Sequence, residues 1–391
     1  MLKAVIFDMD GVLIDSEPIH FETDVNVLKK MGIDLSFDFY KQFIGTPMRN
    51  IWTRIKEKYN IPITVDELID LSEVEKKRII EETGYREIAG VADLVKNISD
   101  NGYLLAVASS SPYEYIQTVT KAININHFFS EILSGEHFEN PKPAPDIFLE
   151  TAKRLGVKPE ECIVIEDSKN GVTAAKAAGM VCLGFINPSS GDQDISAADY
   201  LTEGFEEIDS NFLEMVYCHS LEEPWKVMET QRLIIREISV DDLDNLYKIY
   251  EDDSVTRFTE PLYDRPEEEY FTKAYIKNMY KFYGYGLWVI ILKETGELIG
   301  RAGLSNRNIN GENEVEIGYL FGENFQKKGY AFEACTAIID FAKNKLDLKK
   351  INCFTDAENV NAIQLARKLG FEHVGFSKYE KREYKHFELI L

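Results

Sequence analysis

The chain of 391 residues lacks a long hydrophobic run, and this absence excludes one class of protein at once. A helix that crosses a membrane needs roughly 18 or more consecutive apolar residues, and the sequence contains no such stretch. It also enters a strand-like pattern directly, without the basic region and cleavage site of a secretion signal. We therefore expect a cytoplasmic protein with no membrane partner.

Cysteine and basic residues are also scarce. Five cysteines are scattered through the chain without a CxxC pair, which indicates buried free thiols rather than disulfides or a metal site. The 44 basic residues face 67 acidic ones, a net charge of −23. Such an acidic protein should repel nucleic acid.

The length of the chain and its composition, with 45% hydrophobic and 28% charged residues, are those of a two-domain globular protein. In the first half, short apolar runs alternate with helical patterns, which predicts an α/β fold with a parallel sheet. The predicted strands are 4–7, 104–108, 132–133, 162–165, 181–186 and one near 200–201. Residues 36–85 are helical throughout, and an insertion at this point would lie over the carboxyl ends of the strands.

A new pattern begins at Arg232, and residues 217–230 are expected to link domains at 1–216 and 231–391. The predicted strands of the second domain are 232–238, 286–293, 298–305, 314–321 and 350–355, followed by closing strands. The predicted helices are 241–251, 266–283, 329–345 and 359–369. The second domain is therefore also α/β.

The segment Asp8-Met9-Asp10-Gly11-Val12 follows the first strand. Side chains at i and i+2 of an extended segment point the same way. Two such carboxylates can hold one divalent cation and divide the roles of nucleophile and acid/base between them. On its own the pattern fits a solvated loop equally well.

Three later segments carry polar residues that suit phosphoryl transfer. Ser109 follows the strand 104–108, where a hydroxyl and backbone amides can hold phosphate oxygens, although a helix cap is an equally good interpretation. Lys142 lies between prolines in a stiff turn, or is an ordinary surface lysine. Glu166-Asp167 ends the strand 162–165, and two adjacent buried acids would repel without a cation.

In this order the segments resemble the four motifs of the haloacid dehalogenase-like (HAD) phosphotransferases, over roughly residues 1–215. The resemblance implies a Rossmann-like parallel sheet and makes Asp8 the nucleophile that becomes an aspartyl-phosphate. Asp10 would be the general acid and base, and Ser109 and Lys142 would neutralise the phosphoryl oxygens. The implied ligands of Mg²⁺ are Asp8, the backbone carbonyl of Asp10, Glu166 and Asp167.

The helical insertion, at about 16–86, resembles the α-helical cap of the β-phosphoglucomutase-like subgroup. The resemblance implies a small phosphorylated metabolite as substrate, bound by His20, Gly45, Arg49, Lys76 and Ser110. Lys76 also fits a solvated helix face. A mutase needs a second phosphate clamp in the cap, for which Arg49 is the candidate. The loop at 45–49 lacks the fuller mutase pattern, so a sugar-phosphate phosphatase is favoured and a phosphosugar mutase is the alternative.

The second half contains a strand, 315–321, followed by Gln326-Lys327-Lys328-Gly329-Tyr330-Ala331 at a helix start. Free backbone amides at such a turn can bind a pyrophosphate, although a plain helix start has the same form. With Thr230-Gln231-Arg232-Leu233-Ile234-Ile235-Arg236 at the opening and Lys368-Leu369-Gly370-Phe371 near the end, residues 230–391 resemble the GNAT N-acetyltransferases. The resemblance implies acetyl-CoA as cofactor, bound by Tyr319, Phe321, Gln326, Lys328, Gly329, Tyr330, Ala331 and Asn359.

One departure from this second family concerns proton transfer. The helix that often supplies a tyrosine as general acid carries Leu365-Ala366-Arg367 here. Glu316 or Glu314 could serve as base through a water molecule, or either could face solvent. The resemblance implies an amine acceptor, a small molecule or a protein N-terminus, and a half that only binds acetyl-CoA is the alternative.

Overall fold

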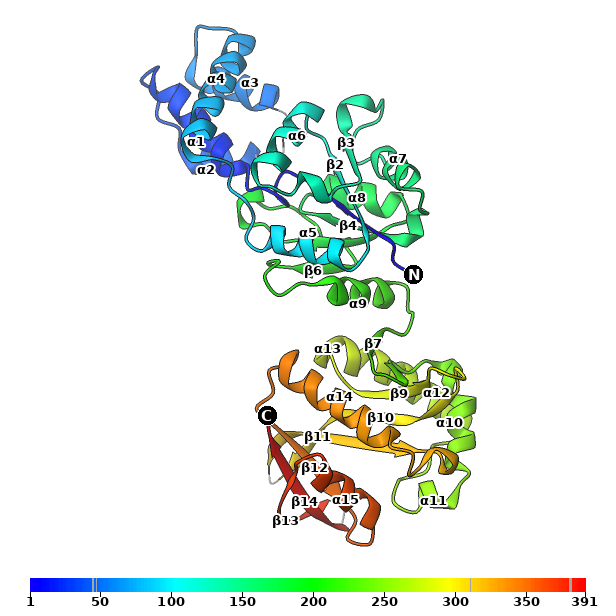
Figure 1. Cartoon of the computed structure of the whole chain (residues 1–391). Coiled ribbons are helices and arrows are strands. Elements are labelled where there is room, and N and C mark those ends of the chain that lie inside the picture. Colours follow the sequence, from blue (N-terminus) through cyan, green and yellow to red (C-terminus); the bar gives the residue numbers. More distant parts are fainter. Residues whose placement is uncertain (44–45, 47, 310, 380–381) are drawn as a thin grey trace. The chain divides into compact units, whose positions relative to one another are not determined.

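The computed structural model describes residues 1–43, 46, 48–309, 311–379 and 382–391. The chain divides into two compact units, Met1–Ser220 and Leu221–Leu391 (Figure 1). The helices within the described ranges are all too short or too polar to cross a membrane.

Six parallel strands form the sheet of the first unit, in the order β3-β2-β1-β4-β5-β6. The strands are β1 (Ala4–Phe7), β2 (Leu104–Ser109), β3 (Glu131–Ser134), β4 (Cys162–Glu166), β5 (Val181–Phe185) and β6 (Tyr200–Thr202). Ala4 and Ile6 pack into the core on one face of the sheet, while Val5 and Phe7 pack on the other. Burial on both faces explains why β1 is a continuous apolar run.

Helices cover both faces of this sheet (Figure 1). The Phe7 face packs against α5 (Val91–Asp100), α6 (Tyr113–Ala122) and α9 (Ser210–Ser220). The Ile6 face packs against α7 (Asp146–Leu155) and α8 (Lys169–Ala177). The prediction of a parallel sheet with helices on both sides is confirmed.

The cap consists of α1 (Glu17–Lys29), α2 (Phe37–Tyr40), α3 (Met48–Tyr59) and α4 (Val65–Thr83). Its own small core surrounds Trp52, which is fully buried. The longest cap helix, α4, begins at a capping box in which Thr64 and Glu67 satisfy each other's backbone amides. The cap therefore has local stability of its own.

The second unit has an eight-stranded sheet in the order β13-β14-β12-β11-β10-β9-β8-β7. Its strands are β7 (Lys226–Glu229), β8 (Leu233–Arg236), β9 (Leu287–Leu292), β10 (Leu298–Ile309), β11 (Glu312–Phe321), β12 (Lys350–Thr355), β13 (Glu372–Tyr379) and β14 (Arg382–Ile390). The paired strands are antiparallel except β11 and β12, which run parallel. The predicted α/β class of this domain is confirmed.

The helices of the second unit are α10 (Leu243–Tyr250), α11 (Asp253–Thr256), α12 (Arg265–Tyr275), α13 (Lys281–Tyr283), α14 (Tyr330–Asn344) and α15 (Val360–Lys368). A π-helical turn, Ile276–Tyr280, separates α12 from α13 within the predicted helix 266–283. The structure differs from the expected linker at 217–230, because α9 extends to Ser220 and β7 occupies Lys226–Glu229. β7 pairs with β8 at the edge of the sheet, and its two end residues are exposed, so its sequence pattern is weak.

Candidate functional site

Polar residues of the first unit meet at the carboxyl edge of its sheet. Asp8 follows β1, Ser109 ends β2 and Glu166 ends β4, and these three strands are neighbours. The amide of Asp8 donates to the carbonyl of Ile165 at 3.0 Å, which fixes the start of the Asp8 loop against β4. Open α/β sheets bind their ligands at this edge.

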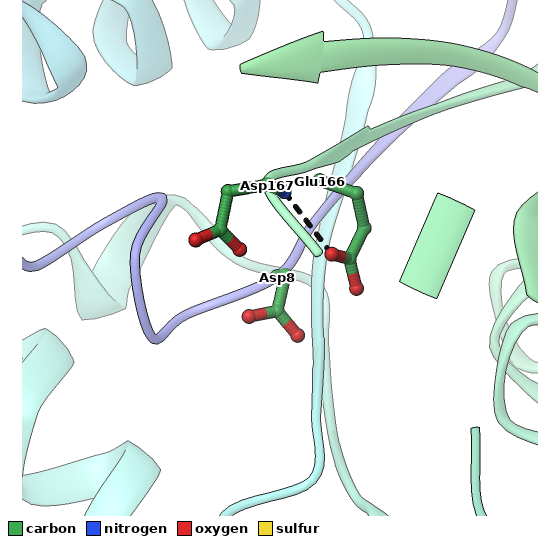
Figure 2. A group of neighbouring side chains, drawn as sticks. All are labelled: Asp8, Glu166 and Asp167. Carbon is green, nitrogen blue, oxygen red and sulfur yellow. Dashed lines mark hydrogen bonds between the residues drawn. The ribbon is translucent and has the colours of Figure 1, made fainter. Parts of the chain in front are cut away.

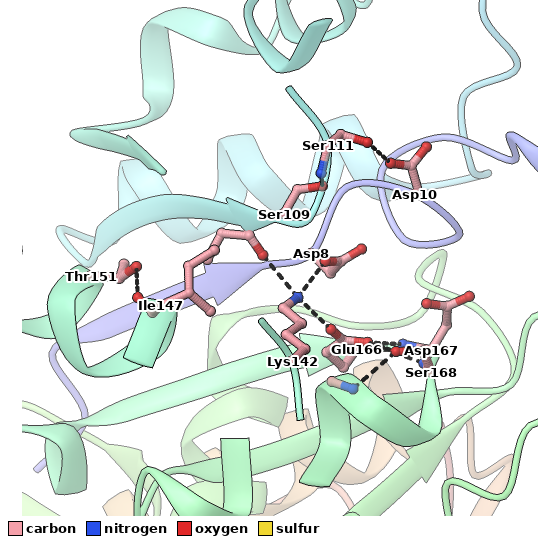
Figure 3. Close-up of polar contacts among 12 residues, drawn as sticks. Asp8, Asp10, Ser109, Ser111, Lys142, Ile147, Thr151, Glu166, Asp167 and Ser168 are labelled. Atoms are coloured by element: carbon pink, nitrogen blue, oxygen red, sulfur yellow. Dashed lines mark hydrogen bonds and ion pairs between the residues drawn. The ribbon is translucent and has the colours of Figure 1, made fainter. Parts of the chain in front are cut away.

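Lys142 lies between two carboxylates, and its side chain is only 6% exposed (Figure 3). Its Nζ is 2.6 Å from Asp8 Oδ1 and 2.7 Å from Glu166 Oε1, and it donates to the Ala108 carbonyl at 3.0 Å. Burial alone would lower the pKa of Lys142, but the attraction of the two carboxylates outweighs it and raises the pKa. Lys142 is thus a buried cation, and the surface-lysine interpretation does not apply.

Asp8, Glu166 and Asp167 are all buried, and each offers an oxygen within 4.8 Å of the others (Figure 2). Burial raises the pKa of Asp8 to about 7 against the opposing charge of Lys142, and Glu166 adds to the rise. Burial and the charge of Glu166 also raise the pKa of Asp167. Three acids around one ammonium leave excess negative charge, which a divalent cation with oxygen ligands would neutralise. The donor set fits Mg²⁺.

The loop after β4 holds Glu166 in a fixed orientation. One oxygen, Oε2, accepts from the amides of Asp167 and Ser168, both at 3.1 Å, and from Ser168 Oγ at 2.9 Å. A Cβ on Gly171 would lie 1.7 Å from Glu166 Oε1. Gly171 is therefore required by close packing against the carboxylate.

Asp10 does not belong to this carboxylate group. Its side chain instead accepts a hydrogen bond from Ser111 Oγ at 2.6 Å (Figure 3). Separation from the three carboxylates suits a proton-transfer group, and coordination by the Asp10 backbone carbonyl stays a prediction. Ser111 was not among the predicted site residues, although it lies in the run Ser109-Ser110-Ser111.

Ser109 is buried, and its Oγ accepts from the amide of Ser111 at 3.1 Å. The N-cap of α6 is Pro112, so the interpretation of Ser109 as a helix cap is wrong. Ser110 is exposed and borders a small cavity together with Lys142.

Two predicted cap residues, His20 and Lys76, interact electrostatically with each other, and Asp10 also acts on His20. Burial, followed by the positive charge of Lys76, lowers the pKa of His20 to about 4, and Asp10 opposes this shift. Lys76 is half-buried, with Nζ 4.6 Å from the centroid of the Tyr115 ring on α6. The solvated-face interpretation of Lys76 therefore does not fit.

The other two cap residues are not part of this group. Arg49 is exposed and forms an ion pair with Asp66 at 2.6 Å. Gly45 lies outside the described residues.

In the second unit, β11 and β12 pair at a single position, Glu316 with Asn352. Beyond this pair the two parallel strands continue without a further rung among the described residues. β11 then leads to the turn before α14, the predicted pyrophosphate site.

The turn at 326–331 is shaped by its backbone. Gly329 is the N-cap of α14 with φ +87°, a conformation that favours glycine. The Gln326 side chain donates to the Phe321 carbonyl at 3.0 Å and so stabilises the turn itself. Lys328 is exposed, and Tyr330 and Ala331 are half-buried at the helix start.

Arg232 borders this turn and was not predicted as a site residue. Its Nη1 donates to the Lys328 carbonyl at 3.1 Å, and its Nε lies 2.6 Å from Glu333 Oε2. The guanidinium carbon is 4.4 Å from the centroid of the Tyr330 ring. The opening sequence that marks the family resemblance contains this arginine, but the sequence alone did not place it beside the turn.

The two candidate bases differ in their surroundings. Glu316 accepts from Ser305 Oγ at 3.1 Å and pairs with Arg307 at 2.8 Å, and burial raises its pKa in spite of Arg307. Glu314 pairs with Lys350 at 2.8 Å, and this hydrogen bond lowers its pKa. The raised pKa makes Glu316 the better proton acceptor near neutral pH.

A buried polar chain crosses the strands beside the pair of Glu316 with Asn352. Asn352 is fully buried and donates to Glu314 and to the Val315 carbonyl, both at 3.1 Å. Its Oδ1 lies 2.8 Å from His386 Nε2, and His386 Nδ1 lies 3.3 Å from Ser377 Oγ. Burial lowers the pKa of His386. Sequence reasoning missed this chain because its members come from separate strands.

The remaining predicted cofactor residues are Tyr319, Phe321 and Asn359. The Tyr319 hydroxyl is buried without a hydrogen-bond partner in the described part of the chain, and Phe321 belongs to the core. The Asn359 side chain accepts from the Ala362 amide at 3.1 Å as the N-cap of α15. This capping contact is the role that the structure shows for Asn359.

Comparison with protein families assigns the two units to different groups. Residues 5–185 match the family described as "Haloacid dehalogenase-like hydrolase", and residues 232–372 match "Acetyltransferase (GNAT) domain".

Individual relatives match the first unit. The chain is 34% identical over 179 residues to "Phosphorylated carbohydrates phosphatase" of Thermotoga maritima, which spans 46% of this chain and 82% of that protein. It is 32% identical over 183 residues to "Hexitol phosphatase B" of Escherichia coli, spanning 46% and 81%. A crystal structure of a "putative beta-phosphoglucomutase" from Thermotoga maritima covers 53% of this chain and 96% of its own, with 32% identity and a TM-score of 0.49.

Proposed function

The chain belongs to the haloacid dehalogenase-like hydrolases and carries a GNAT acetyltransferase domain, and from this premise we propose a two-site enzyme. The first unit is a Mg²⁺-dependent phosphatase of a sugar phosphate or another small organic phosphate. The observation that carries this proposal is Lys142, a buried cation within 2.7 Å of both Asp8 and Glu166.

The proposed reaction has two steps. A carboxylate oxygen of Asp8 attacks phosphorus, the bond to the alcohol breaks, and Asp10 gives its proton to the leaving oxygen. Water then attacks the aspartyl-phosphate and gives a proton back to Asp10, which releases inorganic phosphate and restores Asp8. Lys142 and the Ser109 hydroxyl neutralise the phosphoryl oxygens.

The metal would be held by Asp8, Asp167 and the Asp10 carbonyl, with Glu166 beside them. Its chemistry there is to neutralise charge on the phosphoryl group and on the carboxylates. Lys142 works in the same direction, because its charge opposes the rise in the pKa of Asp8 and so favours the ionised nucleophile.

Arg49 favours a phosphatase over a phosphosugar mutase. A mutase needs a cation in the cap to hold the second phosphate, and Arg49 is already paired with Asp66 on the cap surface. His20, which interacts with Asp10, and Lys76, which interacts with His20, remain to contact the sugar or other leaving group. Incubation with glucose 1-phosphate should release inorganic phosphate rather than form glucose 6-phosphate.

Replacement of the nucleophile tests the phosphatase directly. Asp8→Asn should lower the rate on any phosphorylated substrate by on the order of 10³-fold or more. The matched control is Asp100→Asn, at an exposed carboxylate on α5 that pairs with Lys96, which should leave the rate unchanged. Activity that survives Asp8→Asn in a folded protein would show that the nucleophile is misassigned.

We further propose that the second unit transfers the acetyl group of acetyl-CoA to an amine. The turn at 326–331 would hold the pyrophosphate through the backbone amides at the start of α14. Glu316 would accept the proton that the amine loses as its nitrogen attacks the thioester carbon. Support comes from the position of Glu316, at the pair that joins β11 to β12, and from its raised pKa.

Calorimetry with acetyl-CoA tests this second site. The double variant Gln326→Ala plus Gly329→Asp should abolish binding, because it loosens the turn and adds a negative charge beside the pyrophosphate. Gly296→Asp is the control, since Gly296 also has a positive φ but faces open space in the turn before β10. Absence of binding by the parent protein would refute the proposal.

A further inference from the structure

The short segment Asn187–Ser190, which follows β5, contacts three functional parts of the first unit. Asn187 Nδ2 donates to the Gly11 carbonyl at 2.9 Å, in the loop that follows the nucleophile. Ser190 Oγ forms a short hydrogen bond with Asp167 Oδ2. Ser189 Oγ donates to Asp15 Oδ2 at 2.9 Å. Three side chains from one turn thus reach the nucleophile loop, the metal-binding carboxylate and Asp15.

Asp15 lies where the two connections between sheet and cap run side by side. Its amide donates to the Arg86 carbonyl at 2.8 Å, and Ile14 forms a bridge with Glu87. Asp15 directly precedes the cap helix α1 through Ser16, and Arg86 belongs to the return connection after α4. A change at Asp15 therefore acts on both connections of the cap.

The Asp15 carboxylate depends on Ser189. Its Oδ1 is buried and has no hydrogen-bond partner among the residues that the structure describes. A buried carboxylate oxygen without a partner is destabilising. The hydrogen bond from Ser189 Oγ to Asp15 Oδ2 therefore offsets part of the free-energy cost of burying this carboxylate.

The turn itself is stiff enough to connect these contacts. Pro188 fixes its backbone, the Ser189 amide donates to Asn187 Oδ1 at 2.8 Å, and the Ser190 amide donates to the Asn187 carbonyl at 3.1 Å. Asn187 and Ser190 are buried. Ser189 and Ser190 cannot move independently by much, because they are adjacent in a hydrogen-bonded turn.

The same turn also fixes Asp167 from two sides. A Cβ on Gly11 would lie 2.0 Å from Asp167 Oδ2, so the Gly11 backbone, held by Asn187, packs directly against the carboxylate. Ser190 bonds to Oδ2, and a carboxylate that binds a metal through one oxygen needs only Oδ1.

We propose that Asn187–Ser190 is a brace that couples the metal site to the cap hinge, with Ser190 positioning Asp167 and Ser189 positioning Asp15. This inference rests on the proposed Mg²⁺ site. A bound metal would restrict the motion of Asp167, and the brace would pass this restriction on to Asp15. The hydrogen bonds between the two connections of the cap would then break less often. Substrate admission by the cap would then depend on whether the metal is in place.

Calorimetry of Mg²⁺ binding to the whole chain tests the first contact of the brace. Ser190→Ala should weaken Mg²⁺ binding by about 10-fold, as expected for loss of a group that orients a metal ligand. Ser189→Ala should change the dissociation constant by less than about 2-fold. The control Ser196→Ala removes an exposed hydroxyl that bonds Asp194 at 2.6 Å, and it should change nothing.

Hydrogen exchange of peptides that contain 13–20 and 84–90 tests the second contact. In the parent, Mg²⁺ should slow exchange of the Asp15 and Ile88 amides, which bond to Arg86 and Leu13, by about 5-fold. Ser189→Ala should abolish this slowing of exchange while Mg²⁺ still binds, and Ser189→Thr should restore the slowing. In an Asp15→Ala background, Ser189→Ala should cause no further change in exchange.

The two proposals fail in distinguishable ways. A parent protein that binds no Mg²⁺ would overturn the proposed metal site and the brace with it. A parent that binds Mg²⁺ without slowed exchange at the hinge, or a Ser189→Ala variant that keeps the slowing, would overturn the brace alone.

Discussion

The two units build their candidate sites from different parts of the polypeptide. In the first, the candidate site consists of buried side chains from distant segments, since Lys142 Nζ lies within 2.7 Å of both Asp8 and Glu166. In the second, the proposed site is formed mainly by the backbone of one turn, 326–331, at the start of α14. A site made of side chains should lose activity on a single conservative substitution. A site made of backbone groups should lose binding mainly when a substitution changes the backbone conformation.

The strongest test of this contrast is Lys142→Ala. Removal of the buried cation leaves Asp8 and Glu166 without their partner, so we expect about 3–5 kcal/mol lower stability at pH 8. Phosphatase activity should fall by on the order of 10³-fold. Urea unfolding and initial rates are the measurements. Lys153→Ala, at a lysine of α7 that is 78% exposed, is the control and should stay within about 0.5 kcal/mol of the parent.

Glu316→Gln tests whether acetyl transfer by the second unit also depends on a single side chain. If Glu316 is the base, the acetyltransfer rate should fall by about 10²-fold with acetyl-CoA binding unchanged. Glu314→Gln should have a smaller effect on rate, because Glu314 is already paired with Lys350 and Asn352. A larger loss of rate from Glu314→Gln than from Glu316→Gln would reverse the assignment.

Asp24 is a buried carboxylate of the first unit outside the candidate site, so its substitution tests the effect of burial on stability alone. Burial raises its pKa from 3.8 to about 7, although the hydrogen bond from Ser72 opposes the shift. A raised folded-state pKa stabilises the fold below pH 3.8, and this contribution is lost as the pH rises through 7. Asp24→Asn should therefore match the parent near pH 4 and be about 2 kcal/mol more stable at pH 8. Equal stability at both pH values in urea titrations would contradict the assigned burial of the charge.

Arg232→Lys should give the smallest effect. The ammonium group of a lysine cannot contact Glu333 and the Lys328 carbonyl at the same time in the way that the planar guanidinium of arginine does. We expect about 5-fold weaker acetyl-CoA binding by calorimetry, with phosphatase activity unchanged. Arg257→Lys, at an exposed pair with Glu358, is the control. Unchanged binding in Arg232→Lys would show that the turn keeps its shape without this arginine.

Sequence reasoning located the elements and motif residues of the first unit well, for a physical reason. Asp8, Ser109 and Glu166 directly follow or end apolar strands, and parallel strands bring such ends to one edge of a sheet. The roles of Ser111, Ser189 and Ser190 could not be predicted, because a serine gives no signal of its own until tertiary contacts bring it to Asp10, Asp15 or Asp167.

In the second unit the sequence predicted the strands and the turn but not the groups around them. Arg232 reaches the turn from about one hundred positions away in the chain, and Asn352 and His386 meet only because β12 and β14 pair. The strand β7 lies within the segment that the sequence predicts as a linker, because a strand of four residues at the edge of a sheet has only a weak sequence pattern.

The most direct measurement is the site of covalent phosphorylation. The protein is mixed with a phosphorylated substrate, quenched with acid, and digested for mass spectrometry. We expect one phosphoryl group on the peptide that contains Asp8, absent in Asp8→Asn and present in Asp10→Asn. Turnover without any phosphorylated peptide, or a phosphoryl group on another residue, would contradict it.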